Sequence, residues 1–327
     1  MSTTQVSGIH HVTAIAGDAQ ENVDFYAGLL GMRLVKRSVN QDDPATYHLF
    51  YADAEGHPGS DLTFFPYPQG RRARRGAGVT NEVVLGVPPG SLGWWKERLD
   101  AAGVRSERSD RFGEPTLAFR DPHGLHLALS ESQRLLERPF AAWDKSSVPP
   151  EHQVRGIHAV RLLVHEAEPT VDVATGALGM RFAGHDGEWA RYEGKDPASG
   201  YLEVRAQPDA PRASGGIGSV HHVAWRVADD AEEAEVRAQV TEAGLDPTPV
   251  IDRFWFKSVY FREPGGILFE LATDGPGFGV DEDILTLGES LVLPPWLEAA
   301  RPQIERALAP LSLPHLEKER VAPAAAR

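Results

Sequence analysis

Apolar and polar residues near the start of the chain follow two different periods. Val23, Tyr26 and Leu30 recur at the spacing that places them on one face of a helix. Asp18 precedes this stretch as a suitable N-cap, and Gly31 follows it as a helix end. Short apolar runs separated by turn-forming residues flank the helix. The pattern therefore predicts a strand, a helix and then three further strands.

The first strand of this unit returns later in the chain. Gly8-Ile-His-His-Val-Thr is repeated as Ser219-Val-His-His-Val-Ala and, more weakly, as Gly156-Ile-His-Ala-Val-Arg. Two further segments, Arg120-Asp-Pro-His-Gly and Arg262-Glu-Pro-Gly-Gly, also correspond to each other. Internal repeats of this kind indicate several copies of one supersecondary unit. We expect four β-α-β-β-β modules, at about residues 7–68, 79–133, 154–206 and 218–274.

A Pro-rich link, Ser146-Ser-Val-Pro-Pro150, is the expected domain boundary. It separates an N-terminal domain (residues 7–145) from a C-terminal domain (residues 154–283), and residues 284–327 form a helical, Pro-interrupted tail. A single module leaves one apolar face of a short sheet exposed, so modules must pair to bury it. The expected fold is α+β, with the modules pairing into two curved-sheet cups and the helices outside. Such cups are where ligands bind.

Composition narrows the classes of partner and cofactor. A net charge of −14 disfavours nucleic acid or an anionic membrane as the main partner. The basic run Arg71-Arg-Ala-Arg-Arg75 is interpreted as a solvated connector in preference to a phosphate-binding loop. Because the chain has no cysteine, a metal would have to be held by histidines and carboxylates. No apolar run reaches the roughly 18 residues of a membrane helix and no signal peptide is evident, so we expect a cytoplasmic protein.

The repeated strand indicates candidate metal ligands. Successive strand residues point to opposite faces, so the two histidines of one pair should not both face the cup. The first histidine occurs in three modules but the second only in modules one and four, which favours His11 and His222 for a special task. Glu270 lies between Phe269 and Leu271, where a carboxylate is costly unless it is paired or binds a metal. Two histidines and one carboxylate form the open facial triad of non-haem iron sites.

A fourth protein ligand is not expected. The last strand of module one should place Phe64 or Phe65 at the position that matches Glu270, and module two has a residue near Ala128 there. Without a second carboxylate the metal keeps open positions for substrate. The simpler interpretation of any one of these histidines is a hydrogen-bonded core residue, and their recurrence at matching positions is what favours ligands.

Five segments together resemble one known family. They are Gly8-Ile-His-His-Val-Thr, Asn40-Gln-Asp-Asp-Pro, Tyr47-His-Leu-Phe-Tyr-Ala-Asp, Asp252-Arg-Phe-Trp-Phe-Lys-Ser and Arg262-Glu-Pro-Gly-Gly-Ile-Leu-Phe-Glu. The chain up to about Asp283 resembles the ring-cleaving dioxygenases of the vicinal oxygen chelate (glyoxalase/bleomycin-resistance) superfamily, above all the hydroquinone-cleaving branch. The resemblance implies Fe(II) held by His11, His222 and Glu270. It also implies a polar group of residues around the substrate, namely His10, Thr13, His221, Arg253 and Tyr260.

The activity that the resemblance implies is O2-dependent opening of a hydroquinone, substituted hydroquinone or catechol ring beside a hydroxyl-bearing carbon. Fe(II) is the expected cofactor, and Mn(II) accepts the same ligands. A small aromatic diol and O2 are the expected partners of a homo-oligomeric enzyme. Arg253 and Tyr260 are expected on the strand pair that leads to Glu270, and His10 or His221 is a candidate to move a proton. The aromatic residues Trp255, Phe254, Phe256 and Phe64 are candidate pocket walls and equally candidates for the core.

Three alternatives remain open at this level. A catechol-type dioxygenase would build its site from the last two modules and recruit His158 near Glu203, but Ala159 replaces the second histidine there. A metal-dependent isomerase or lyase of the glyoxalase type would need no oxygen and commonly carries a second acidic ligand. A binding protein of the same superfamily would need no metal at all, since fold does not determine function.

Overall fold

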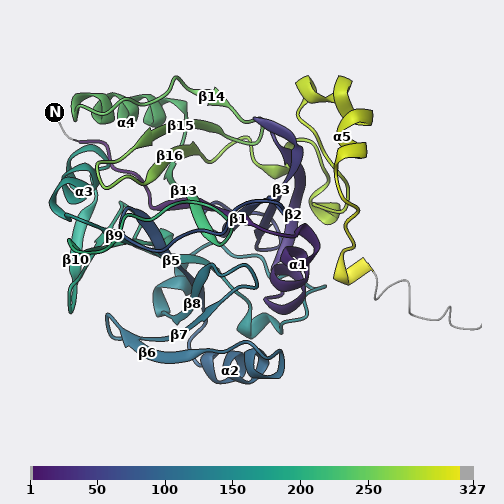
Figure 1. Cartoon of the computed structure of the whole chain (residues 1–327), viewed down its shortest axis with the longest axis horizontal. Coiled ribbons are helices and arrows are strands. Elements are labelled where there is room, and N and C mark those ends of the chain that lie inside the picture. Colours follow the sequence, from purple (N-terminus) through teal and green to yellow (C-terminus); the bar gives the residue numbers. More distant parts are fainter. Residues whose placement is uncertain (1–2, 317–327) are drawn as a thin grey trace, which may run out of the picture.

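The chain forms two eight-stranded sheets, each built around a central antiparallel strand pair. The computed structural model describes residues 3–316 of the 327-residue chain. The central strands β1, β13, β5 and β9 cross the middle of the molecule, with α4 covering one outer face and α2 the other (Figure 1). This arrangement confirms the predicted α+β fold of curved-sheet cups with helices outside.

The first sheet combines the strands of modules one and four. In spatial order its strands are β14 (Ile251–Asp252), β15 (Lys257–Arg262), β16 (Leu268–Thr273), β13 (Ser219–Val227), β1 (Ile9–Ala16), β4 (Asp61–Pro66), β3 (Asp43–Ala52) and β2 (Arg33–Asn40).

The second sheet combines modules three and two in the same order. Its strands are β10 (Arg181–Asp186), β11 (Trp189–Glu193), β12 (Tyr201–Ala206), β9 (Gly156–Val164), β5 (Val79–Val87), β8 (His126–Glu131), β7 (Glu114–Arg120) and β6 (Glu107–Arg111).

Each sheet therefore joins one module from either half of the chain. The division into an N-terminal domain (7–145) and a C-terminal domain (154–283) stays a prediction about chain segments, and the sheets do not follow it. The physical reason is that the first strand of each module carries one unpaired edge. β1 satisfies that edge with β13, and β5 satisfies its edge with β9.

Five α-helices cover the sheets in the described part of the chain. Two of them, α1 and α3, continue directly into π-helical turns. Asp18 caps α1 as predicted, since its carboxylate accepts from the backbone N–H groups of Gln20 and Glu21. Their bounds are α1 (Ala19–Val23, then Asp24–Leu29), α2 (Leu92–Ala101), α3 (Glu168–Asp172, then Val173–Ala177), α4 (Asp230–Glu242) and α5 (Arg301–Ala307).

None of the helices in residues 3–316 is long and apolar enough to cross a membrane. Within the predicted tail, α5 and the preceding 3-10 helix Pro295–Ala300 confirm the helical, Pro-interrupted pattern. The remainder of that tail, residues 317–327, lies outside the described part of the chain.

A buried arginine ties the two sheets together. Arg138 follows module two, and its guanidinium donates to the carbonyl oxygens of Gly59, Ile157 and Ala198. Gly59 belongs to module one, while Ile157 and Ala198 belong to module three. Burial lowers the pKa of Arg138 to about 10. One side chain thus satisfies carbonyl groups on both sheets at the seam between them.

Candidate metal centre

Three side chains from neighbouring strands converge in the first sheet. His11 lies on β1, His222 on β13 and Glu270 on β16, and all three are buried. His11 Nε2 lies 3.3 Å from His222 Nε2 and 3.4 Å from Glu270 Oε2, and His222 Nε2 lies 2.9 Å from the same oxygen. These residues form a group that could hold a metal ion. The repeat in the sequence identified all three.

Strand register explains why residues about 210 and 260 positions from His11 reach it. β1 pairs with β13 and β13 with β16, so the three strands lie side by side. Thr13 is opposite His222, and Ala224 is opposite Glu270. The triad therefore occupies one cross-strand strip of the sheet, with two ligands from the central strand pair.

The first histidine of each pair sits in a β-bulge. The register between β1 and β13 slips once at His10 and once at His221, so each is an extra residue relative to its partner strand. This corrects the expectation of strict alternation, because His221 lines the same cavity as His222. The bulges also bring the rings of each pair together. His10 Nδ1 lies 2.9 Å from His11 Nδ1, and His221 Nδ1 lies 2.8 Å from His222 Nδ1.

These contacts determine how the imidazoles of the triad are presented. His10 also forms a hydrogen bond with the Thr273 backbone, whose carbonyl requires a donor, so His10 Nδ1 is left to accept the proton of His11 Nδ1. Nε2 of His11 then carries a lone pair directed at the triad. Burial, with the neighbouring His11, lowers the pKa of His10 to about 3. His10 is therefore a neutral acceptor that orients His11.

His221 has the same relation to His222. Burial, followed by the charge of His222, lowers the pKa of His221 to about 4. A neutral His221 that accepts from His222 Nδ1 leaves His222 Nε2 unprotonated and aimed at Glu270. The two imidazoles and the carboxylate then present acceptor atoms to one another.

The Glu270 carboxylate is only half satisfied by the protein. Its Oε1 accepts from the Ser258 hydroxyl at 2.6 Å, whereas Oε2 is buried without a hydrogen-bond partner in the described residues, despite the short approach of His222. Burial by itself raises the pKa of Glu270, whereas positive charge on His11 and His222 lowers that pKa well below its ordinary value. A cation bound to neutral imidazoles would supply the same positive charge. Converging acceptors around a buried anionic oxygen fit a bound cation, and two histidines with one carboxylate match the open facial triad.

The predicted absence of a fourth ligand is supported, but at a different residue. Thr13 is opposite Thr63 on β4, so Thr63 occupies the position that corresponds to Glu270 in module one. Phe64 and Phe65 follow it. In module two the matching residue is Ala128, as expected, opposite Val84. Neither position supplies a second carboxylate.

An aromatic cavity of about 320 Å³ opens from the triad. Its apolar wall includes Trp255 and Phe256, as predicted, together with Phe50 and Phe65. Of the two possibilities left open by the sequence, Phe64 takes the core, where it is fully buried against Tyr26 and Tyr51. Phe254 packs on Trp255 outside the lining. The polar lining residues are Asn40, Gln41, Asp42, His48, Tyr67, His221, Arg253 and Tyr260.

Arg253 and Tyr260 both reach this cavity, though not from a strand pair as expected. Tyr260 lies on β15 directly opposite Glu270, whereas Arg253 lies in the loop after β14. The Arg253 guanidinium lies 5.4 Å from the centre of the Tyr260 ring and forms a bidentate ion pair with Asp42 at 3.0 and 3.3 Å. Burial raises the pKa of Tyr260 well above its ordinary value. Asp42 was missed because its turn looked like a loop signal alone.

A short hydrogen-bond chain forms another wall of the cavity. Thr13 and Thr63 share a hydrogen bond of 2.7 Å, and His48 Nε2 lies 2.9 Å from the Thr63 hydroxyl. The His48 ring also makes tilted contacts with the rings of Phe50 and Phe65. Burial lowers the pKa of His48 well below its ordinary value, so its ring is neutral. The sequence indicated Thr13 only through the resemblance, and His48 was missed because a lone histidine in a strand carries no distinguishing pattern.

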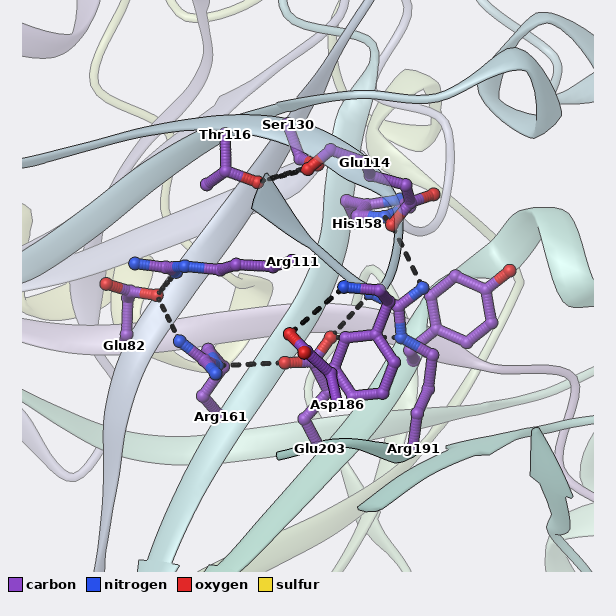
Figure 2. A network of polar contacts seen from close by, with 12 residues as sticks. Glu82, Arg111, Glu114, Thr116, Ser130, His158, Arg161, Asp186, Arg191 and Glu203 are labelled. Carbon is purple, nitrogen blue, oxygen red and sulfur yellow. Dashed lines mark hydrogen bonds and ion pairs between the residues drawn. The ribbon is translucent and has the colours of Figure 1, made fainter. Parts of the chain in front are cut away.

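The second sheet shows what the same positions contain without a metal group. By register, Glu82, Ala159 and Glu203 correspond to His11, His222 and Glu270. Figure 2 shows the guanidinium of Arg161 lying between Glu82 and Glu203, at 3.5 and 2.8 Å.

His158, the candidate for a catechol-type site, lies in this second network. Its Nε2 is 2.9 Å from Glu114, which also accepts from Arg191 (Figure 2). His158 therefore contacts neither His222 nor Glu270. The alternative in which the last two modules build the site is not supported by this geometry.

Comparison with known proteins agrees with this architecture. The family model described as the Glyoxalase/Bleomycin resistance protein/Dioxygenase superfamily matches residues 8–129 and 156–271. The chain is 40% identical over 310 residues to the Bacillus subtilis (strain 168) protein named "Putative ring-cleaving dioxygenase MhqO", covering 95% of this chain and 98% of that one. It is 35% identical to the chlorohydroquinone/hydroquinone 1,2-dioxygenase of Sphingobium indicum, covering 93% and 96%.

Solved structures show the same relationship. A crystal structure of a "putative dioxygenase" from Bacillus subtilis superposes with a TM-score of 0.90 at 39% identity, covering 95% of this chain and 99% of that one. Glyoxalase I from Zea mays shares the fold alone, with a TM-score of 0.59 at 17% identity over 82% of this chain and 92% of that one. The chain belongs to the glyoxalase/bleomycin resistance protein/dioxygenase superfamily.

Proposed function

We propose that this protein is an Fe(II)-dependent ring-cleaving dioxygenase of the extradiol type. Its substrate is a hydroquinone, or a substituted hydroquinone or catechol, opened next to a hydroxyl-bearing carbon with both atoms of O2 incorporated. The observation that carries the proposal is the open triad of His11, His222 and Glu270 at the base of an aromatic cavity. The names of the relatives, ring-cleaving and hydroquinone dioxygenases, point in the same direction.

His11, His222 and Glu270 would hold the metal through Nε2, Nε2 and Oε2. A bound Fe(II) supplies the redox chemistry that lets O2 react with an aromatic ring, and Mn(II) fits the same ligand set. The protein's own part is to fix the ligand geometry. His10 and His221 orient the two imidazoles, and Ser258 fixes the carboxylate.

The cavity suits a single substituted aromatic ring. Its volume of about 320 Å³ lies at the lower end of the range for small-molecule sites, and Phe50, Phe65, Trp255 and Phe256 can pack against ring faces and edges. These side chains also exclude water from the reacting atoms. A hydroquinone presents two hydroxyl groups on opposite ends of such a ring. One of them would face the triad and the other the polar part of the wall.

Charged and polar groups in that wall have complementary roles. Arg253 is positive at any ordinary pH, and its bidentate contact with Asp42 holds it beside Tyr260. We assign Arg253 to stabilise the phenolate form of the substrate and Tyr260 to donate a hydrogen bond to substrate or oxygen. His48, whose Nε2 contacts the Thr63 hydroxyl, would orient the substrate ring. Thr13 shares a hydrogen bond with Thr63 and is opposite the triad residue His222 on the neighbouring strand. Of the two paired histidines His10 and His221, it is His221 that lines the cavity and can contact the substrate; a neutral His221 that accepts from His222 would do so as a donor through Nε2.

Oxygen uptake tests this proposal directly. Protein loaded anaerobically with Fe(II) is offered a panel of hydroquinones and catechols, and one O2 consumed per ring opened is the expected result. His11→Ala should abolish both uptake and tight metal binding. His185→Ala provides a matched control, because His185 is exposed on β10 in the other sheet.

The alternative outcome has an equally clear meaning. A protein that binds one metal ion per chain but consumes no O2 with any diphenol is not a ring-cleaving dioxygenase. The same preparation would then be assayed, without oxygen, for isomerase or lyase activity of the glyoxalase type.

A further inference from the structure

A second hollow lies away from the triad, where the two long connectors between modules meet. Residues 71–77 run beside residues 212–217 through bridges that pair Arg72 with Ile217, Arg74 with Ser214 and Ala77 with Arg212. The hollow of about 200 Å³ is bounded by the first connector, the start of β5, the loop between β7 and β8 and the start of β13. It therefore touches modules two and four and both connectors.

The lining of this hollow carries charge of one sign only. Arg72, Arg74, Arg75 and Arg120 contribute to it, and no aspartate or glutamate does. Arg72, Arg74 and Arg75 are exposed, as the interpretation of residues 71–75 as a solvated connector predicted, and they also border this hollow. The chain as a whole carries a net charge of −14.

The protein provides these arginines with few partners. The recorded side-chain bonds of Arg72, Arg74 and Arg75 go to neutral groups: the His123 carbonyl at 3.4 Å, the Ser214 hydroxyl at 3.2 Å and His126 Nδ1 at 2.9 Å. The Arg120 side chain has no hydrogen bond or ion pair with any other residue in the range 3–316. The nearest carboxylate that acts on Arg75 is Glu82, which already pairs with Arg111 and Arg161.

Unsatisfied polar atoms in the wall are an independent observation. Thr80 and His123 both line the hollow and are only 5% exposed. Thr80 Oγ1 and His123 Nδ1 have no hydrogen-bond partner in the described residues, although Glu21 contacts the other ring nitrogen of His123. A buried polar atom without a partner is energetically costly, so a ligand or water that reaches these groups is favoured.

The local field is positive enough to act on a neighbouring side chain. His126 lies against Arg75, and burial together with the charges of Arg75 and Arg120 lowers the pKa of His126 to about 4. Arg120 likewise lowers the pKa of Arg75, after the larger effect of burial. The guanidinium groups of Arg75 and Arg120 thus repel each other, and the carboxylate of Glu82 offsets this only in part at Arg75.

We propose that this hollow is a binding site for a small oxyanion, namely phosphate, sulfate or the phosphoryl group of a larger molecule. Guanidinium groups match the oxygens of tetrahedral anions through paired N–H donors. A volume of about 200 Å³ is below the roughly 300–1,000 Å³ of pockets that enclose a drug-sized ligand, so an isolated anion or a terminal group fits best. The site is independent of the metal centre, and its existence does not depend on the proposed dioxygenase activity.

Isothermal titration with inorganic phosphate, at an ionic strength held constant with sodium chloride, measures the binding. The test variant is Arg74→Gln with Arg120→Gln, because neither side chain has a strong partner to lose, and Arg75 stays intact since it donates to His126. Arg71→Gln with Arg306→Gln is the control. It removes the same charge from two exposed arginines outside the hollow.

Wild type and control should bind one phosphate per chain, and the test variant should bind it at least tenfold more weakly. Phenyl phosphate added to the same series distinguishes the sources. Tighter binding of the monoester indicates a phosphoryl group on a larger molecule, whereas tighter binding of phosphate indicates the free ion. Equal losses in test and control variants, or heats that sodium chloride reproduces, would overturn the site.

The Tm measured without phosphate is a second test. It distinguishes arginines that bind an anion from arginines that only stabilise the fold. If the arginines await an anion, the test variant should melt at the same temperature as wild type or higher, since their mutual repulsion is relieved. Phosphate should then raise the Tm of wild type and not that of the variant. A lower Tm for the variant in the absence of phosphate would show that the arginines stabilise the fold themselves and would contradict the proposal.

Discussion

Within residues 3–316, the Ser258 side chain supports the carboxylate of the triad. Its hydroxyl donates to Glu270 Oε1, and both residues are fully buried. The other oxygen, Oε2, is thereby turned toward His11 and His222. Because Tyr260, two residues further along β15, is directly opposite Glu270, the same strand supplies both the support of the ligand and a wall of the cavity. Removal of this one hydroxyl group is therefore expected to weaken metal binding more than it lowers the stability of the fold.

We predict that Ser258→Ala weakens metal affinity by about 10–100-fold, the effect typical of lost contacts to a ligand. The reason is that Glu270 can then rotate away from the histidines. Competition with a coloured chelator measures the affinity. Ser130→Ala is the matched control, since Ser130 is equally buried on β8 of the second sheet and bonds only Thr116 and a backbone carbonyl. Equal affinities for wild type and Ser258→Ala would show that Glu270 needs no support.

At the scale of elements, β2 fixes the segment that follows the last module. Lys36 on β2 is fully buried, and its ammonium group pairs with Asp281 at 2.7 Å and with Glu282. Asp281 also accepts from Trp255 Nε1 at 3.1 Å. Since Trp255 lines the cavity, this ion pair connects residues after the fourth module to the shape of the site. The segment between the fourth module and the predicted tail therefore has a structural role that its sequence did not indicate.

We predict that Lys36→Met lowers the free energy of unfolding by about 3 kcal/mol, because it leaves Asp281 and Glu282 without their cation. It should also raise the KM for the aromatic substrate more than it changes kcat, since Trp255 loses its anchor. Urea unfolding and steady-state kinetics measure the two effects. Lys257→Met is the control, because Lys257 pairs with Asp230 at the surface and should have a much smaller effect.

The sequence predicted elements better than it predicted their pairing. The recurring His-His strand was enough to predict the module, the α+β fold and the candidates His11 and His222, whereas Glu270 was selected from its place in an apolar strand. The recurring strand did not predict that modules one and four pair with each other. The first strands of all modules have similar unpaired edges, so any two of them could pair. β6 (Glu107–Arg111) was also not anticipated. Its residues are almost all polar and exposed, so it lacks the alternation that marks a strand.

Site residues beyond the triad were predictable only where a pattern or a resemblance indicated them. His10 and His221 belonged to the repeat, but the bulges that bring them against their neighbours depend on pairing between β1 and β13. Asp42 and His48 reach the cavity from the turn after β2 and from β3. Their direction follows from register in the folded sheet, which single-sequence patterns do not determine.

At the scale of the whole molecule, one architecture occurs twice with different contents. The second sheet repeats the bulge at His158, in the position of His221. Where the first cup has converging acceptor atoms, the second has arginines packed on aromatic rings: Arg161 lies 3.8 Å from the centre of the Trp189 ring and Arg191 lies 3.9 Å from that of Phe112. The positive charge that a metal would supply in one cup is thus supplied by guanidinium groups in the other. We expect one metal ion per chain.

The ion pairs of the second cup can be tested through the pH dependence of stability, because they shift the pKa of Glu114. Burial alone raises its pKa, but His158, which bonds it, and Arg191 more than offset this and lower the pKa from 4.5 to about 2 in the folded protein. A carboxyl group whose pKa is lowered by folding stabilises the protein at pH values above 4.5. That contribution is lost as the pH falls toward 2, because the folded state must then take up the proton that the unfolded chain has already bound.

We therefore predict that Glu114→Gln destabilises the protein at pH 7 and that the difference from wild type shrinks steadily from about pH 4.5 downward. Urea unfolding of both proteins at a series of pH values measures it. Glu188→Gln should show little difference at any pH, since its contact with Arg205 is at the surface. A gap between wild type and Glu114→Gln that stays constant down to pH 3 would mean that Glu114 acts through its shape and not through its charge. The second cup would then be held by packing on Phe112 and Trp189 more than by its ion pairs.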